Sequence, residues 1–320
     1  MPQKFNRREW NSLILTGLAG SFIPSVFTSC STTSVVPAAL KGSQAASDAK
    51  ELGIVLGVQT YSFRDRSLVE AIKAMQQLGV KSCELWAGHV EPRNNQWAAG
   101  QTGADAKKKQ EQLAQWREKL SMDEIRSIKS QFDRAGISIQ AYNGGIKDGI
   151  SDEELDLVFR IAQTLGVDTV TSSATVSVMK RVDEYAKKYK MRVAMHNHAH
   201  IDKPNEFSSP DSFARAMDGL SDYLWINLDI GHFTAANFDA VAYIKQHHAK
   251  IHSIHVKDRK KNQGENMPFG QGDTPIAQVL QLIRDNKWPI PANIEYEYKG
   301  ADTIMEVGKC LDYCKRAIKA

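Results

Sequence analysis

The chain has no strong excess of charge, few cysteines and no long uninterrupted apolar run, and each of these absences excludes a class of protein. Its 320 residues contain 41 Lys and Arg against 37 Asp and Glu, a formal charge of +4. The segment 4–9 supplies +2 of this charge, three cations minus Glu9, which leaves +2 for the rest of the chain. A charge so close to balance gives no basis for nucleic-acid binding. The hydrophobic share of 42% and the count of four cysteines exclude a disordered chain and a disulfide-dense mini-protein.

The cysteines predict no disulfide. Cys310 and Cys314 are one helical turn apart, a spacing that rarely suits disulfide geometry. Together with Cys83 they are interpreted as buried or idle thiols. Cys30 belongs to a different feature, the N-terminal segment.

The first fifty residues resemble an export signal followed by a tether. Arg7 and Arg8 precede an apolar stretch over 10–27, and small residues lead to Cys30. A basic start, an apolar middle and small residues before a cleavage point are typical of a signal peptide. The arginine pair resembles a twin-arginine signal, and the segment before Cys30 resembles a lipobox with Phe27 where Leu is usual. We expect a signal over 1–30 with lipidation at Cys30, and a small-residue tether over 31–52.

A transmembrane anchor is the alternative for this stretch. A membrane span needs about 20 strongly apolar residues. The stretch here is short and contains Gly17, Gly20 and Pro24. Export is therefore favoured, to the periplasm or to a membrane-anchored lipoprotein of a Gram-negative bacterium.

From residue 54 onward, short β-rich runs alternate with amphipathic helical patterns. This alternation predicts one (β/α)8 TIM barrel over residues 53–320, in the α/β class. No Gly-x-Gly-x-x-Gly follows the first run, which disfavours a doubly wound sheet. The long 87–121 connection is interpreted as a lid or a disordered insertion. The expected strands are 54–59, 82–86, 137–141, 169–171, 192–197, 224–229, 251–256 and 292–296. The expected helices are 67–78, 122–134, 151–164, 175–189, 210–219, 237–247, 274–285 and 302–316.

Imidazoles and carboxylates gather at the ends of the last four expected strands. His196, His198 and His200 alternate at one end, and the next three carry Asp229 with His232, His255 with Lys257, and Glu295 with Glu297. The C-terminal ends of barrel strands meet at one mouth. Carboxylates and imidazoles crowded into a small cleft need a neutralising charge, and a divalent cation supplies it. The pattern therefore predicts a metal site. The histidines at 89, 247, 248 and 252 are interpreted as structural.

An ordered set of short motifs resembles the xylose isomerase-like barrels, a family that includes tagatose epimerases, inosose dehydratases and proteins labelled sugar phosphate isomerase/epimerase. The motifs span most of 54–316. They are GVQTYSFR at 57–64, CELW at 83–86, MHNH at 195–198, DIGH at 229–232, HVKD at 255–258, FGQGD at 269–273 and IEYE at 294–297.

The resemblance implies a metal ligand set of Glu, Asp, His and Glu on successive strand ends. Asp229, His255 and Glu295 match three of these positions. At the first position the family's Glu-Asn-His reads His196-Asn197-His198, so His196 is the candidate ligand and His198 its rival. This departure removes one of the two carboxylates that epimerases of the family use for proton transfer on opposite faces of the sugar. A divalent ion is expected, with Mn, Co, Zn, Fe and Mg all open.

The remaining groups around the site are candidates for catalysis and for sugar contacts. Glu84, His198, His232 and Lys257 are available as acids, bases or oxyanion stabilisers. Lys257 has a structural pairing with Asp258 as its alternative role. The expected contacts to substrate are Gln59, Tyr61, Trp86, Tyr142, Asn197 and Glu297. Ordinary rim packing is the alternative for Tyr61, Trp86 and Tyr142.

The hypothesis for function is a metal-dependent lyase or hydratase on 3-keto-glycosides. A base takes the C2 proton, an enediolate forms, and C1 loses or gains a substituent. Export favours glycosides over phosphorylated metabolites, and the family resemblance extends to barrels that cleave 3-oxo-glycosides in this way.

Three alternatives stay open. They are isomerase or epimerase chemistry on a free ketose, a non-catalytic lipid-anchored sugar-binding protein, and a metal-dependent endonuclease. The last needs three metals and a basic groove that the charge does not provide. The expected partner is a small carbohydrate, with no nucleic acid and with membrane contact only through the lipid anchor. The oligomeric state, a homo-oligomer included, stays open.

Overall fold

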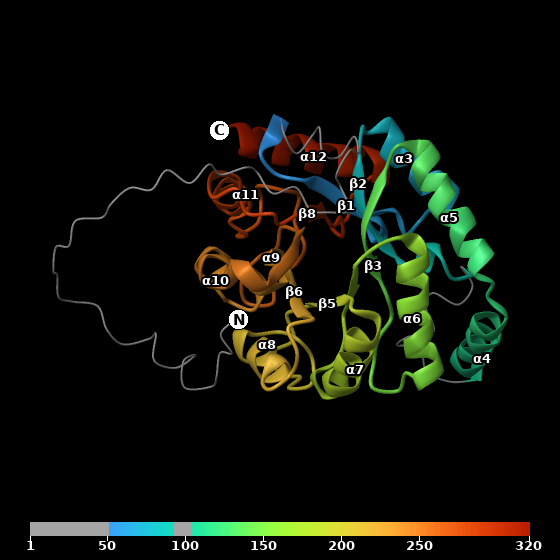
Figure 1. The fold of residues 1–320 in the computed structure, drawn as a ribbon. Helices are drawn as coiled ribbons and strands as arrows, with labels where there is room; N and C mark the ends of the chain where they lie inside the picture. Colours follow the sequence, from blue (N-terminus) through green and yellow to red (C-terminus); the bar gives the residue numbers. More distant parts are fainter. Residues whose placement is uncertain (1–50, 93–103) are drawn as a thin grey trace, which may run out of the picture.

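The computed structural model describes residues 51–92 and 104–320. Eight parallel strands close into a barrel in the order β1 to β8, each paired with its neighbours in sequence and β8 with β1. The predicted TIM barrel is therefore confirmed, and Figure 1 shows the helices arranged around it. The strands are β1 Leu56–Gln59, β2 Ser82–Trp86, β3 Ser138–Asn143, β4 Thr169–Ser172, β5 Arg192–His196, β6 Leu224–Asp229, β7 Ile251–Val256 and β8 Ala292–Ile294.

The helices between the strands largely follow the sequence pattern. Ser67, Ser121 and Ser151 each close a capping box at a helix start. Gly136 and Gly166 end helices in the left-handed conformation, at φ of 67° and 75°, which a residue without Cβ adopts at no steric cost. The helices are α3 Leu68–Gln77, α4 Ala104–Lys119, α5 Met122–Ala135, α6 Asp152–Leu165, α7 Met179–Tyr189, α8 Pro210–Met217, α9 Ile230–Ala235, α10 Ala240–His247, α11 Ile276–Asp285 and α12 Thr303–Lys319.

Three features differ from the expectation. The 87–121 connection contains a helix, α4, and residues 93–103 of it lie outside the described part. A short helix, α9, follows β6 directly and begins with Asp229 as its N-cap. Strand β8 ends at Ile294, so that Glu295 and Glu297 lie in the loop after it rather than on the strand.

The N-terminal predictions cannot be placed on this structure. The signal over 1–30, its arginine pair, Cys30 and the 31–50 part of the tether lie outside the described residues. Within the described ranges, no helix has both the length and the apolar character needed to cross a membrane. Cys83, Cys310 and Cys314 are buried free thiols, as predicted.

Candidate metal centre

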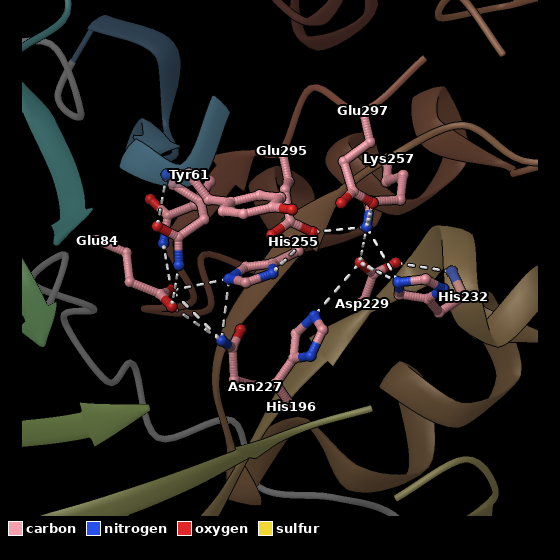
Figure 2. A network of polar contacts seen from close by, with 12 residues as sticks. Tyr61, Glu84, His196, Asn227, Asp229, His232, His255, Lys257, Glu295 and Glu297 are labelled. Atoms are coloured by element: carbon pink, nitrogen blue, oxygen red, sulfur yellow. Dashed lines mark hydrogen bonds and ion pairs between the residues drawn. The ribbon is translucent and has the colours of Figure 1, made fainter. Parts of the chain in front are cut away.

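Four side chains from consecutive strand ends meet at the mouth of the barrel. His196 ends β5, Asp229 ends β6, His255 lies on β7, and Glu295 follows β8. All four are buried, and one donor atom from each lies within 4.8 Å of the others. His196 Nε2 is 3.4 Å from Asp229 Oδ2, and His255 Nδ1 is 3.5 Å from Glu295 Oε2 (Figure 2). The predicted ligand set therefore comes together in space.

The donor atoms of this cluster fit a metal ion. Among the described residues, the two imidazole nitrogens that face the cluster, His196 Nε2 and His255 Nδ1, are buried without a hydrogen-bond partner, whereas Asp229 Oδ2 and Glu295 Oε2 contact the Lys257 ammonium. A buried polar atom is rarely left without a partner, because its desolvation is then uncompensated. Ligand atoms at the usual 2.0–2.2 Å from a tetrahedral ion lie about 3.4 Å apart. The two observed separations match this value, and two imidazoles with two carboxylates suit a divalent transition metal.

The second nitrogen of each imidazole is held by a neighbour. His196 Nδ1 is 3.1 Å from Ser173 Oγ, and His255 Nε2 is 2.9 Å from Glu84 Oε2. Such contacts orient a metal-binding imidazole and fix which nitrogen has a free lone pair. His196 Nε2 and His255 Nδ1 are thereby directed at the cluster.

Glu84 lies inside the barrel, below the metal cluster. Its side chain is 0% exposed. One oxygen accepts hydrogen bonds from Gln59 and Thr171, at 2.7 and 2.6 Å, and the other contacts His255. Burial alone would raise the pKa of Glu84, but His255, Thr171 and His196 together outweigh it and hold that pKa below its usual value. The structure places Glu84 behind His255, where it can orient that imidazole, and the catalytic role of Glu84 stays a prediction.

Two expected substrate contacts turn out to hold the scaffold. Asn197 is fully buried, with its amide bound to both the backbone oxygen and the backbone nitrogen of Asp229, at 3.1 and 2.9 Å. Gln59 donates to Glu84 and accepts from the backbone N–H of Tyr61. Because their polar atoms are engaged below the mouth, neither Asn197 nor Gln59 is placed to contact a sugar.

Lys257 is the counter-ion of the cluster. Its ammonium lies 3.1 Å from Asp229 Oδ2, 2.6 Å from Glu295 Oε2 and 2.6 Å from Glu297 Oε2. Burial would lower the pKa of Lys257, but these three carboxylates raise it well above its usual value. Lys257 therefore stays charged. The alternative pairing with Asp258 is wrong, since Asp258 instead accepts from the backbone N–H groups of Gly270 and Gly272.

His232 lies between two cationic side chains. The Arg259 guanidinium is 2.7 Å from His232 Nδ1, and the Lys257 ammonium is 3.1 Å from Nε2. Burial and the ammonium of Lys257 lower the pKa of His232 well below its usual value. His232 is thus neutral, and each of its ring nitrogens faces a cation that can only donate.

The wall of the mouth contains two of the three expected aromatic residues. Tyr61 and Trp86 are partly exposed and pack edge to face at 4.9 Å. Figure 2 shows Tyr61 beside Glu295 and His255. Tyr142 is 1% exposed and belongs to the apolar core, because its place on β3 points it away from the inward-facing Asn143. The expected sugar contact at Tyr142 is therefore corrected, whereas Tyr61, Trp86 and Glu297 lie at the mouth.

The structure also separates the two rival histidines. His196 joins the cluster, while His198 lies in a second group with His200 and Glu206. Among the residues that the sequence reasoning missed, Arg259 orients His232, and Asn227 contacts both Glu84 and His255. Strand parity could have found Asn227, since it lies two residues before Asp229 on the same inward face.

Comparison with known proteins shows the family of this chain. Residues 72–314 match the family described as the xylose isomerase-like TIM barrel. The chain belongs to this family. Among curated proteins it resembles L-ribulose-5-phosphate 3-epimerase UlaE of Escherichia coli, at 26% identity over 169 residues, half of this chain. The match spans 58% of that relative's length.

Two solved structures share the fold of this family member. The 3-keto-D-glucoside 4-epimerase YcjR of E. coli superposes with a TM-score of 0.59 at 10% identity, covering 82% of this chain and 98% of that one. The IOLI protein, solved with a bound zinc atom, gives 0.58 at 14% identity with the same coverage. At these identities the likeness concerns the fold alone.

Proposed function

We propose that the protein is a divalent-metal-dependent carbon–oxygen lyase, or the corresponding hydratase, acting on 3-keto-glycosides. One observation carries the proposal: the end of β5 lacks the carboxylate that the resemblance implies there, whereas carboxylates are present at the end of β6 and after β8. Glu295 and Glu297 follow β8, and Asp229 is fully buried at the end of β6. At the position where the resemblance implies a further carboxylate, β5 presents His196 instead.

His196 is poorly suited to replace that carboxylate as a base. Its Nδ1 is engaged with Ser173, and its Nε2 faces Asp229 as a candidate metal donor. An epimerase that inverts a carbon with two bases needs a proton acceptor on each face of the sugar. Elimination needs only one base, and the leaving group departs with a proton. The presence of His196 in place of the second carboxylate therefore favours elimination.

The proposed step balances as follows. The base removes the proton from C2, which is acidified by the neighbouring 3-keto group. The C2–H electron pair forms a C1=C2 double bond and the C1–oxygen bond breaks. The proton taken from C2 passes from the base to the departing oxygen, so that the aglycone leaves as an alcohol. The hydratase direction adds water across the same double bond. A bound divalent ion would act as a Lewis acid on the substrate's oxygens.

The roles of the chain's own residues follow from their exposure and charge. Glu297, with 23% of its side chain exposed, is the most accessible carboxylate of the site and the proposed base. The ammonium of Lys257, with the ring of His232 beside it, would stabilise the negative charge that develops on substrate oxygen. Tyr61 and Trp86 would pack against the sugar ring. The solved 3-keto-D-glucoside 4-epimerase supports the substrate class, since a barrel of the same fold acts on such a compound.

The proposed location fits this substrate class. The expected signal over 1–30 and the lipidation at Cys30 would place the enzyme at the cell envelope, where glycosides are met before uptake. Its partner would be the small carbohydrate itself.

The test compares two substrates with and without a chelator. Metal-loaded protein is incubated with a 3-keto-glucoside carrying a chromogenic aglycone, and separately with a free ketose. We expect aglycone release only from the keto-glucoside, abolished by chelation and restored by added metal. Conversion of the ketose alone would reject the proposal. It would favour the second candidate, an isomerase or epimerase, which the likeness to an L-ribulose-5-phosphate 3-epimerase supports.

A further inference from the structure

A second group of metal-ligand side chains lies in the loop that follows β5. His198, His200 and Glu206 each offer one donor atom, and these atoms lie within 4.8 Å of one another. Glu206 Oε2 is 2.9 Å from His200 Nδ1 and 3.5 Å from His198 Nδ1. The second separation is close to the about 3.4 Å expected between ligands of a tetrahedral ion, and the first is a hydrogen bond that an ion would replace. The group shares no residue with the cluster of His196, Asp229, His255 and Glu295.

The backbone fixes the three side chains relative to one another. The N–H of His198 donates to the carbonyl of Phe207 at 2.8 Å, which joins the two ends of the loop. Glu206 pairs with Thr175 in an antiparallel bridge. His198 and His200 are two residues apart. Because both ends of the loop are tied down, little backbone ordering would be required when an ion binds.

Two lysines lie near the group: Lys203 forms an ion pair with Glu206, and Lys147 interacts electrostatically with Glu206 and His198. Lys203 contacts Glu206 through Oε1, at 3.3 Å, whereas both histidines face Oε2. The Lys203 side chain is 52% exposed, so its ammonium can withdraw into water. Two imidazoles and one carboxylate form the ligand set of zinc sites that keep an open coordination position.

We propose that His198, His200 and Glu206 bind a second divalent ion of the zinc type at the rim of the barrel mouth. The ring of His198 lies 5.3 Å from that of His196 and 5.8 Å from that of His200, so the two centres are neighbours. The open position of the second ion would accept water or a hydroxyl group of the bound carbohydrate. This ion would hold the carbohydrate in place and would have no role in proton transfer.

The test counts ions and does not depend on activity. Metal-free protein is dialysed against zinc chloride in slight excess and analysed by mass spectrometry for zinc per chain. We expect His200→Ala to bind one equivalent less than wild type, and His255→Ala also one less, through loss of the other centre. The double variant should lose two equivalents.

Lys203→Ala is the matched control, because it removes a neighbour of Glu206 that is not a ligand. It should keep the wild-type count. Since His200 is exposed, circular dichroism should show an unchanged fold for His200→Ala, and Glu206→Gln provides a second variant that should also lose one equivalent. Equal zinc content in wild type, His200→Ala and Glu206→Gln would overturn the proposal, whatever the outcome of the lyase assay.

Discussion

Replacing Glu84 by Gln tests whether the buried network beneath the metal centre prepares it for metal. Glu84 accepts from His255 Nε2 at 2.9 Å, which leaves Nδ1 as the metal donor. Changing a residue that orients a metal-binding imidazole weakens metal affinity roughly 10- to 100-fold. That range equals about 1.4–2.8 kcal/mol. We expect a loss of this size for Glu84→Gln.

Stability should fall in the same variant. Each carboxylate oxygen of Glu84 accepts hydrogen bonds, from Gln59 and Thr171 on one side and from His255 on the other. The amide of Gln replaces one acceptor by a donor, so at least one buried donor loses its partner. The cost is about 1–3 kcal/mol of unfolding free energy.

The assay is a competition titration of metal-free protein against a chromophoric chelator, alongside urea unfolding. Glu306→Gln is the matched control. Glu306 is also a buried carboxylate and lies on α12, away from the cluster. It accepts from Tyr298 and, one turn along the helix, from Lys309. It should lower stability and leave the metal dissociation constant unchanged. If Glu84→Gln binds metal as tightly as wild type, the positioning role of Glu84 is refuted.

Three further predictions concern the mouth and the centre. Replacing Arg259 by Met removes the guanidinium that holds the His232 ring beside Lys257. We expect kcat to fall with metal content unchanged, and Arg259→Lys should restore part of it. An unchanged kcat in the Met variant would contradict this role. Burial would lower the pKa of His255, but its carboxylate neighbours raise it well above the usual value. A metal ion must therefore displace a proton from His255, so metal affinity should increase with pH. Calorimetry in buffers of different ionisation enthalpy should detect the released proton. Metal binding without proton release would count against His255 as a ligand. Trp86→Ala should raise KM for the sugar, whereas Tyr142→Phe should leave KM unchanged because that ring lies in the core; the reverse pattern would refute the assignment of the sugar wall.

The sequence was informative about the barrel because its signals are local. Alternating short strands and capped helices predict the βα units, and the strands at 82–86, 224–229 and 251–256 have the predicted bounds. The ligand set could also be predicted, since all barrel strands direct their C-terminal ends to one mouth and the four residues lie at such ends. The helix at 104–119 was missed because its polar sequence carries little of the apolar periodicity that marks a buried face.

Depth within the barrel could not be predicted. Glu84, Gln59 and Asn197 are polar and near strand ends, so they were assigned to catalysis and sugar contacts. Glu84 on β2 meets His255 on β7 only because the barrel closes, while Gln59 and Asn197 bond to the neighbouring strands β2 and β6. Tyr142 was misplaced for another reason, because an aromatic side chain was weighed more heavily than its outward position on β3.

The central claim is that this metal centre removes a C2 proton and expels the C1 substituent of a 3-keto-glycoside. Proton NMR of metal-loaded protein with a 3-keto-glucoside in D2O tests it most directly. The account predicts that the C2–H signal is lost in step with release of the aglycone, and that both stop when the metal is chelated. Aglycone release with the original C2–H retained in the sugar product, or full turnover by chelated protein, would contradict it.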